Sequence, residues 1–362
     1  MLYPIYKPYI SNIEKDLVND CLDSTWISSK GKYIEMFEDK VAKYTGSKYA
    51  VAVSNGTVAL HLALLAHDIG LGDEVFLPDF TYIATSNSVL YVNATPVFCD
   101  VEPNNWNLDL NKITDKITSK TKAIMIPNIY GNPANFDAIK KIANKHNLII
   151  IEDSAESLGA KYKGKMSGNL GDISTLSFFG NKTITTGEGG MVLTNDYEKY
   201  KKLLKLRNQG NSDKIRYYHD ILGYNYRMTN IQAAIGVGQM SKIHDILEKK
   251  KKIQSYYENE LSKFVKFQKI ESDVSSSYWL VSFLLKDENQ RNSLMSYLDS
   301  ENIETRPFFK QISSMPFYEK IDNKVSIHLS ETGMSVPSYP ELNEVDIKFI
   351  CNKIKYFLKN NL

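Results

Sequence analysis

The sequence predicts an α/β fold in which helices flank a mostly parallel sheet of seven strands, followed by a smaller α+β domain. The first observation is that, from about residue 48, apolar runs of strand length alternate with segments of helical periodicity. The second is that runs such as Leu-Ile-Ile-Ile at 148–151 are apolar throughout, which is typical of parallel strands covered on both faces. The third is that the pattern changes near residue 245, so we expect a large domain over 1–245 and a small domain over 246–362.

The elements of the large domain follow from their local patterns. Short runs of strand-like composition predict strands at 49–53, 74–77, 96–101, 123–126, 148–151, 174–178 and 191–194. Apolar residues at helical spacing predict helices at 14–24, 57–67, 109–117, 134–146 and 196–207, with a loop at 26–31 and a hairpin at 159–166. Binding sites in such folds lie at the carboxyl ends of the strands, so functional residues are expected there.

The small domain is expected to begin with a long charged helix near residue 245. Strands are then predicted at 278–285 and around 303–305, and helices at 287–300 and 342–359. The run Glu-Lys-Lys-Lys-Lys at 248–252 indicates a solvated helix face, in preference to a nucleic-acid patch. A net charge of +2 likewise gives no reason to expect nucleic acid or an anionic membrane as the main partner.

Composition and cysteine usage limit the class of protein. Hydrophobic residues make up 43% of the 362 residues and charged residues 24%, which is ample for a core and typical of a soluble protein. The three cysteines lie far apart, the six histidines lack metal-ligand spacing, and no apolar run approaches membrane-spanning length. These features predict a cytoplasmic protein with reduced thiols, no metal site and no membrane segment.

Gly56 and Thr57 follow the predicted strand at 49–53 and open an apolar helix. Such a turn presents free backbone N–H groups, and the positive end of the helix dipole favours a phosphate group. The alternative is an ordinary helix cap by Asn55 or Thr57. The segment alone therefore indicates either a phosphate site or a structural cap.

Asp153 and Glu156 come directly after the most apolar strand. Acidic residues at the end of a buried strand are unfavourable unless they meet a partner. Asp153 could face a protonated ring nitrogen, with Glu156 beside it. The alternative is again a helix cap, and the segment by itself favours neither interpretation.

Lys182 lies between a strand-like run and a glycine-rich turn, five residues after Ser177. A lysine buried beside a phosphate and an aromatic ring can lose its proton and attack a carbonyl. A phosphate cradle, a carboxylate for a pyridinium, a hydroxyl and a lysine for an aldehyde are together the groups that pyridoxal phosphate needs. Tyr82 is a candidate for stacking on the cofactor ring, or else an aromatic core residue.

Four segments resemble the sugar-nucleotide aminotransferases, which are fold type I pyridoxal phosphate enzymes, and the resemblance covers nearly the whole chain. The segments are 177–190 around Lys182, 54–60, 152–156 and the stretch Gly-Tyr-Asn-Tyr-Arg-Met-Thr-Asn at 223–230. In particular, the lysine segment and the Tyr-Asn-Tyr-Arg-Met stretch are very similar to those of members that form GDP-perosamine. The resemblance implies a fold type I architecture and transfer of an amino group from glutamate to C4 of a nucleotide-linked 4-keto-6-deoxyhexose, giving a perosamine- or viosamine-type sugar.

The resemblance also implies roles for individual residues. Lys182 is expected to form the Schiff base and later shuttle a proton, Asp153 to pair with the pyridine nitrogen, and Glu156 to lie near the phenolic oxygen. Tyr82 is expected to stack on the ring. The phosphate is expected to be held by Gly56, Thr57, Ser177 and, from the neighbouring subunit of a homodimer, Asn225. Substrate contacts are expected from Trp26, Ser28, Tyr226, Arg227, Arg306 and Phe308.

Two places depart from the perosamine-forming relatives. After Phe309 those enzymes usually continue with Tyr-Pro and a nearby His, where this chain has Lys-Gln-Ile-Ser at 310–313, and they usually have His in place of Asn128. Both places are expected to face the site or its rim, so a viosamine-type product on UDP or dTDP competes with perosamine on GDP. Two further alternatives are a sugar dehydratase of the same family, in which His commonly replaces the lysine, and a non-catalytic sugar-nucleotide-binding relative.

Overall fold

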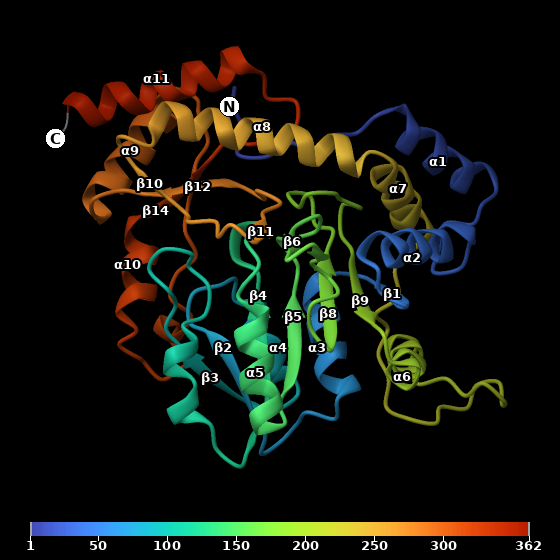
Figure 1. Ribbon diagram of the computed structural model, residues 1–362. Coiled ribbons are helices and arrows are strands. Elements are labelled where there is room, and N and C mark those ends of the chain that lie inside the picture. Colours follow the sequence, from blue (N-terminus) through green and yellow to red (C-terminus); the bar gives the residue numbers. More distant parts are fainter. Residues whose placement is uncertain (1, 361–362) are drawn as a thin grey trace.

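The computed structural model describes residues 2–360 and places a seven-stranded sheet between layers of helices (Figure 1). The strands occur in the order β1-β9-β8-β5-β4-β2-β3, and β9 is antiparallel to both of its neighbours while the other pairs are parallel. This confirms the predicted mostly parallel seven-stranded sheet. Its strands are β1 (Tyr49–Val53), β2 (Glu74–Pro78), β3 (Thr95–Cys99), β4 (Thr121–Pro127), β5 (Ile149–Asp153), β8 (Ile173–Ser177) and β9 (Gly190–Thr194).

Different helices cover the two faces of the sheet. Successive side chains of a strand point to opposite faces, so neighbouring residues of one strand pack against different helices. Val75 of β2 packs in the cluster that contains α3 (Gly56–Ala66), and the next residue, Phe76, packs in the cluster that contains α5 (Phe136–His146). Figure 1 shows α5 in front of the sheet with α3 and α4 (Ala84–Tyr91) behind it. The apolar helix α3 is therefore enclosed on nearly all sides, as its sequence predicts.

The predicted helix at 109–117 is wrong. This stretch forms two short 3-10 turns, η1 (Leu110–Lys112) and η2 (Thr114–Lys116). The carboxylate of Asp109 accepts a hydrogen bond from the backbone N–H of Asn111. Short polar side chains that bond to the nearby backbone in this way compete with a continuous α-helix.

Four helices were not expected from the sequence: α2 (Lys32–Thr45), α4, α7 (Asn230–Ser241) and α10 (Lys324–Thr332). Two glycines give α7 a weak intrinsic tendency to form a helix. In the fold, a Cβ added to Gly236 would lie 2.6 Å from the ring of Phe37, so this glycine permits close packing of α7 on α2. Tertiary contacts therefore override local propensity here.

The second part of the chain forms a four-stranded antiparallel sheet in the order β10-β12-β14-β13. The strands are β10 (Lys266–Phe267), β12 (Val281–Leu284), β13 (Arg306–Pro307) and β14 (Gly333–Val336), and the helices that pack around them include α8 (Ile243–Leu261), α9 (Glu288–Ser300) and α11 (Glu344–Asn360). The strand expected around 303–305 is therefore displaced toward the C-terminus. Residues near the N-terminus also reach this part, since Tyr3 forms a β-bridge with Ile303. The domain boundary at residue 245 stays a prediction.

The remaining structure joins or extends these two units. The predicted hairpin is present as β6 (Lys161–Tyr162) and β7 (Lys165–Met166), and β11 (Val274–Ser275) pairs with β6. The segment from Asn12 to Asp23 forms α1, and α6 (Tyr197–Arg207) follows β9. Within residues 2–360, none of the helices is both long enough and apolar enough to span a bilayer.

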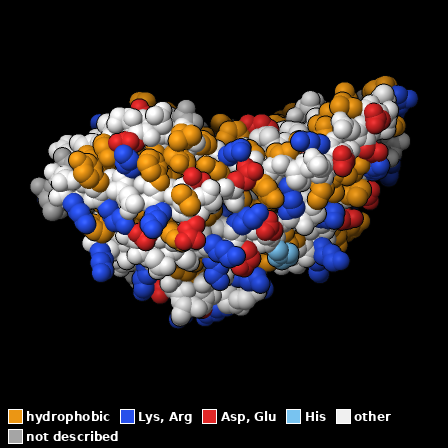
Figure 2. Space-filling view, turned by 90° about the horizontal axis from the view of Figure 1, so that it is seen from above, with side chains coloured by type: hydrophobic (Ala, Val, Ile, Leu, Met, Phe, Trp, Pro, Cys, Tyr) orange, Lys and Arg blue, Asp and Glu red, His pale blue; other side chains and the backbone are white. Residues whose placement is uncertain are grey.

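The basic run on α8 does not form a single patch. Lys249 pairs with Asp245 at 2.8 Å. Lys250 lies on the inner face of α8 and is buried. Figure 2 shows lysines, arginines and acidic residues interspersed over the face that α8 and α11 cover, with hydrophobic side chains between them.

Candidate active site

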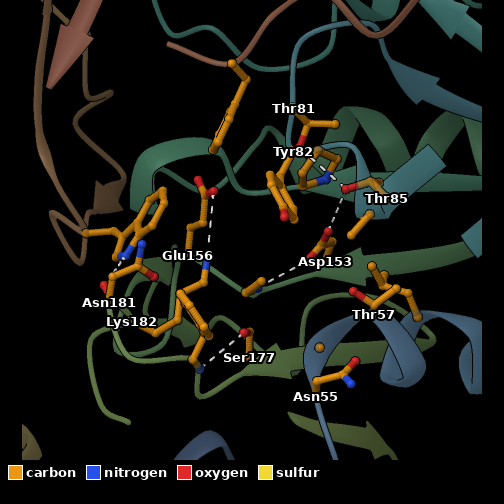
Figure 3. Close-up of a pocket in the computed structure, with 18 of the residues that line it drawn as sticks. Asn55, Thr57, Thr81, Tyr82, Thr85, Asp153, Glu156, Ser177, Asn181 and Lys182 are labelled. Carbon is orange, nitrogen blue, oxygen red and sulfur yellow. Dashed lines mark hydrogen bonds and ion pairs between the residues drawn. The ribbon is translucent and has the colours of Figure 1, made fainter. Parts of the chain in front are cut away.

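A cavity of about 660 Å³ lies where the carboxyl ends of the central strands meet the N-terminus of α3 and the second sheet (Figure 3). It brings together most of the predicted cofactor residues, which come from segments far apart in the sequence. Those lining it are Gly56, Thr57, Tyr82, Asp153, Glu156, Ser177 and Lys182, and Arg306 lines it from the second sheet. The position agrees with the expectation for an α/β sheet.

Lys182 lies in the glycine-rich turn after β8, and its side chain is only 13% exposed. Its Nζ is 3.9 Å from Oε1 of Glu156 and 4.0 Å from the centre of the Trp279 ring. Burial lowers the pKa of Lys182, while the carboxylates of Glu156 and Asp153 oppose that shift. The amine of Lys182 therefore loses its proton more readily than the amine of a surface lysine.

The backbone on either side of this lysine is held by side chains from distant segments. Tyr6 donates its hydroxyl hydrogen to the carbonyl oxygen of Lys182 at 2.7 Å. Trp279 donates its indole N–H to the carbonyl oxygen of Asn181, also at 2.7 Å. Because two consecutive carbonyls are fixed, the direction in which the Lys182 side chain leaves the turn is fixed as well.

Asp153 ends β5 and lies buried in the cavity wall. Its Oδ2 accepts a hydrogen bond from the hydroxyl of Thr85 at 2.9 Å, and its Oδ1 accepts one from the backbone N–H of Ala155 at 3.1 Å. Burial raises the pKa of this carboxyl, although both hydrogen bonds oppose the shift. The residues directly after β5, 154–160, form a turn and not a helix, so the helix-cap alternative does not apply.

Glu156 lies three residues further along and is also buried. Its Oε2 accepts a hydrogen bond from the backbone N–H of Tyr130 at 2.7 Å. Burial raises its pKa to about 7, against the lowering effect of the nearby Lys182. Figure 3 shows Glu156 beside Lys182, joined to it by a dashed line, with Tyr82 across the cavity.

The N-terminus of α3 forms the opposite end of the cavity. Asn55 caps this helix, because its Oδ1 accepts from the backbone N–H of Val58 at 3.0 Å. The backbone N–H groups of Gly56 and Thr57 belong to the first turn and have no acceptor within the helix. They lie at the positive end of the helix dipole. A Cβ on Gly56 would lie 2.8 Å from Cβ of Ser177, so glycine is needed for the hydroxyl to approach this helix end.

These groups fit pyridoxal phosphate. The helix end and Ser177 suit a phosphate, and Asp153 is a buried carboxylate without a cation bonded to it, which suits a protonated ring nitrogen. Lys182 lies in the same cavity with a lowered pKa, which suits reaction with an aldehyde. The Asn55 cap and the phosphate cradle are therefore compatible interpretations of one segment.

An aromatic wall closes the side of the cavity next to the second sheet. The rings of Tyr130 and Phe309 are stacked, with centres 5.7 Å apart and planes 9° apart, and Trp279 stacks on Tyr130 at 5.9 Å. Tyr82, which is 55% exposed, lies 5.7 Å from Phe309. Sequence analysis missed Trp279, Tyr130 and Thr85, because none of them belongs to a local motif.

Several residues predicted to contact cofactor or substrate do not line this cavity. Trp26, Ser28 and Asn225 are exposed, and Arg227 donates to Oδ1 of Asn225 at 2.8 Å. Tyr226 stacks on Tyr224 and bonds to His61. All of them lie outside the cavity of their own chain.

Phe308 needs a correction as a candidate substrate contact. It is 2% exposed and packs among Phe80, Trp106 and Tyr130 in the core. The adjacent Phe309 lines the cavity instead. Successive side chains of an extended segment point to opposite sides, so a shift of one residue exchanges core and cavity.

The departures at 310–313 and Asn128 also take a different place from the one expected. Lys310 is exposed and pairs with Glu288, whereas Gln311 and Ser313 are buried outside the cavity lining. Asn128 touches the cavity, but its amide donates to Oε1 of Glu152 at 2.9 Å and to two serine hydroxyls. Neither departure presents a free polar group to the cavity.

Comparison with known proteins agrees with this geometry. The model of the DegT/DnrJ/EryC1/StrS aminotransferase family matches residues 8–355. The chain is 47% identical to GDP-perosamine synthase of Escherichia coli O157:H7 over 98% of each chain, and 42% identical to GDP-perosamine synthase of Vibrio cholerae over 98% of this chain and 99% of that one. It resembles the X-ray structure of an aminotransferase from Psychrobacter cryohalolentis with a TM-score of 0.92 and 30% identity, covering 98% of each chain.

Proposed function

Because the chain belongs to the DegT/DnrJ/EryC1/StrS aminotransferase family, we propose that it transfers the amino group of glutamate to C4 of a GDP-linked 4-keto-6-deoxyhexose. The protein is a sugar aminotransferase, and its cofactor is pyridoxal phosphate. The observation that carries the proposal is a buried lysine in one cavity with two buried carboxyl groups and a helix N-terminus. The product would be a GDP-linked 4-amino-4,6-dideoxy sugar of the perosamine type.

We assign the residues of the cavity as follows. Pyridoxal phosphate, when bound, supplies an aldehyde that exchanges amino groups and a protonated ring that withdraws electrons. Asp153 binds the ring nitrogen and keeps it protonated, while Glu156 lies near the phenolic oxygen and Tyr82 against the ring face. The phosphate is held by Gly56, Thr57 and Ser177.

Lys182 is assigned as the group that moves the proton. A general base must be neutral when it accepts a proton, and burial lowers the pKa of Lys182 toward that state. The carboxyl of Glu156, 3.9 Å away, can hold a proton near neutral pH because its pKa is raised to about 7. The pair therefore offers two sites for one proton near neutral pH.

GDP is proposed as the nucleotide carrier. The two perosamine synthases above are 47% and 42% identical to this chain. The sequence argument against GDP consists of the departures at 310–313 and at Asn128. The first segment is buried outside the cavity lining or paired with Glu288, and the amide of Asn128 is bonded to Glu152 and two serines. Arg306 and Phe309 are proposed to contact the sugar nucleotide, because both line the cavity.

We further propose a homodimer with shared active sites. Asn225, Trp26, Ser28 and Arg227 lie outside the cavity of their own chain, which is consistent with contribution to the site of a second copy. Tyr226 is proposed to support this segment through its contact with His61. The two-domain division at residue 245 and a cytoplasmic location are also proposals, the latter supported by three cysteines that are free and buried.

The first experiment tests Lys182. We expect Lys182→Ala to lower turnover with glutamate and GDP-4-keto-6-deoxymannose by at least about a hundredfold, because proton transfer from a positioned side chain contributes on that order or more. Lys242→Met is the matched control, since Lys242 is 12% exposed and pairs with Glu14 away from the cavity. Wild-type turnover in the Lys182→Ala variant would refute the assignment.

The second experiment tests the nucleotide. Initial rates with glutamate are compared for GDP-, UDP- and dTDP-linked 4-keto-6-deoxyhexoses at equal concentration. The proposal predicts the highest kcat/KM for the GDP-linked substrate. A higher value for the UDP- or dTDP-linked substrate would replace the perosamine-type product by a viosamine-type one.

A further inference from the structure

We propose that Asp79 is a positioning residue, and this inference rests on the proposed function. It holds in place the wall of the active site that carries Arg306 and Phe309, which are proposed to contact the sugar nucleotide. Asp79 follows β2 and is fully buried, but it does not line the cavity. Its carboxylate joins the large sheet unit to the segment 311–323, which leads away from the cavity wall at Phe309.

The carboxylate of Asp79 accepts four hydrogen bonds from this segment. Its Oδ1 accepts from the backbone N–H of Ser313 at 2.7 Å. Its Oδ2 accepts from the hydroxyl of Ser313 at 2.7 Å, from Nε2 of Gln311 at 2.8 Å and from Nδ2 of Asn323 at 2.8 Å. The backbone carbonyl of Asp79 also accepts from the N–H of Ile312 at 2.9 Å.

All four side-chain contacts are with neutral donors, so the carboxylate depends on them for its stability inside the protein. The amide of Gln311 also donates to the hydroxyl of Ser313 and to the carbonyl oxygen of Ile321. The donors therefore hold one another in place as well as the carboxylate. A segment fixed at this many points has little freedom to move relative to β2.

Both ends of this connection lead to the cavity. Thr81 and Tyr82, two and three residues after Asp79, line it on one side. Arg306 and Phe309 line it on the other, and Phe309 lies two residues before Gln311. The ring centres of Tyr82 and Phe309 are 5.7 Å apart, so the Asp79 contacts determine how closely these two walls approach.

The lysine side of the site is held by other contacts. Lys182 is fixed through Tyr6 and Trp279, and Ser177 belongs to β8. Tyr82, which is assigned to the cofactor ring face, follows β2 of the large sheet, whose pairing does not depend on the Asp79 contacts. Phe309, by contrast, leads directly into the segment that the Asp79 carboxylate holds, and Figure 3 shows Tyr82 across the cavity from Lys182. Loss of the Asp79 contacts is therefore expected to change sugar-nucleotide binding more than reaction with glutamate.

Asp100 provides a matched control at the end of the neighbouring strand β3. It is 2% exposed and accepts from the backbone N–H and the hydroxyl of Ser326, both at 2.9 Å. Asp100 thereby holds α10 in place, and Asp79 holds the preceding segment, 311–323, in place. Unlike Asp79, Asp100 also pairs with Lys112 at 3.3 Å, so the serine pair Ser313 and Ser326 is the closer match. Neither Asp100 nor the residues of α10 line the cavity.

The experiment compares Asp79→Asn with Asp100→Asn, and Ser313→Ala with Ser326→Ala, in the holoenzyme. Glutamate reaction is followed alone by the cofactor absorbance, and the sugar reaction by steady-state kcat and KM for the GDP-linked keto-sugar. We expect Asp79→Asn to lower kcat/KM for the keto-sugar about ten- to hundredfold, mainly through KM, with the glutamate reaction within about twofold of wild type. Ser313→Ala is expected to lower kcat/KM for the keto-sugar several-fold. Both control variants, Asp100→Asn and Ser326→Ala, are expected to leave KM within about twofold of wild type.

The outcomes separate this assignment from the proposed function. A wild-type enzyme that does not use the keto-sugar would overturn the proposed function and this assignment with it. An active wild type with equal KM changes in the Asp79 and Asp100 variants would overturn the assignment alone. If Asp79→Asn fails to fold, Ser313→Ala against Ser326→Ala decides the question, because each serine variant removes one hydroxyl and leaves the backbone N–H donor in place.

Discussion

Burial shifts the protonation of all three charged groups around the Lys182 turn toward the neutral form. It lowers the pKa of Lys182 and raises the pKa of Asp153 and of Glu156, the last to about 7. The three groups partly offset one another, since the lysine charge opposes the shift of each acid. The cavity without cofactor therefore carries less charge near neutral pH than its residue types suggest.

Glu156 gives a pH-dependent prediction for the cofactor-free protein. Its pKa is 4.5 in an ordinary setting and about 7 in the fold, so the folded chain binds an extra proton between these values. Stability is therefore highest below pH 4.5 with respect to this group, and falls as pH rises to about 7. We expect Glu156→Gln to raise the free energy of unfolding relative to wild type by about 2–3 kcal/mol more at pH 8 than at pH 4.5.

Urea denaturation at the two pH values measures this difference. Glu198→Gln is the control, because Glu198 is 75% exposed and pairs only with Lys201 on the surface of α6. Its effect is expected to be small and nearly the same at both pH values. A Glu156→Gln effect that does not grow with pH would show that the carboxyl is ionised in the fold at ordinary pH.

The residues that could be predicted are those whose chemistry is visible in a local string. Lys182 and Ser177 belong to one segment, and Asp153 follows an obvious strand. Trp279 and Tyr6 could not be predicted, because they reach the lysine turn only through the packing of distant segments. The resemblance implies Phe308 as a substrate contact, whereas Phe309 lines the cavity, because a family pattern does not show which of two adjacent side chains points into the cavity.

At the scale of elements, Glu152 explains why a charged residue lies inside the most apolar strand. It is fully buried at the end of β5, and its carboxylate accepts five hydrogen bonds. The donors are Asn128, Ser167, Ser174 and the backbone N–H groups of Gly168 and Leu170. These contacts tie the segment after the β6–β7 hairpin to the centre of the sheet, so Glu152 is structural where its neighbour Asp153 faces the cavity.

Substitution of Glu152 should therefore weaken the fold. In Glu152→Gln a side-chain NH₂ replaces one acceptor among donors, which leaves buried groups without partners. We expect the free energy of unfolding to fall by about 3 kcal/mol in urea denaturation. Glu74→Gln is the control, since Glu74 accepts only from Thr118 and Thr121 at the other end of the sheet, and its loss should be under about 1 kcal/mol.

The elements themselves were predictable to the extent that their own residues specify them. All seven strands of the large sheet come close to the predicted ranges, because each is a short run of strand-like residues, most of them apolar or β-branched. Helices α4 and α7 were missed because Ser, Thr, Asn and Gly in their sequences favour other structures. Both helices form because many of their residues are buried against the rest of the fold. The helix predicted at 109–117 failed for a local reason: Ile113 is buried in the core, but Asp109 bonds to the nearby backbone and the stretch forms short 3-10 turns.

At the scale of the whole molecule, the segment after α6 is the most conspicuous feature outside the compact body. Figure 1 shows it extending away from α6 at the edge of the large sheet. Tyr217 and Leu222 in this segment are 83% and 82% exposed, and Asn225 follows it on the surface. Large apolar side chains exposed together on a projecting segment are typical of a surface that is covered by another chain, which supports the proposed homodimer.

Subunit complementation tests whether Asn225 serves the site of the other copy. Lys182→Ala and Asn225→Ala are each expected to be nearly inactive as homodimers. After the two variants are unfolded together and refolded, half of the dimers are mixed, and each mixed dimer has one site with Lys182 from one copy and Asn225 from the other. Activity should therefore return to about a quarter of wild type, as expected for a two-fold symmetric dimer.

The control for this experiment is a mixture in which both copies carry the same change. Lys182→Ala mixed with a Lys182→Ala, Asn225→Ala double variant has no site with both residues intact, so it should stay inactive however the subunits pair. If instead Asn225 acts within its own chain, every mixed dimer combines one site without Lys182 and one without Asn225. The mixture of single variants would then remain as inactive as its parents, and the shared-site arrangement would be wrong.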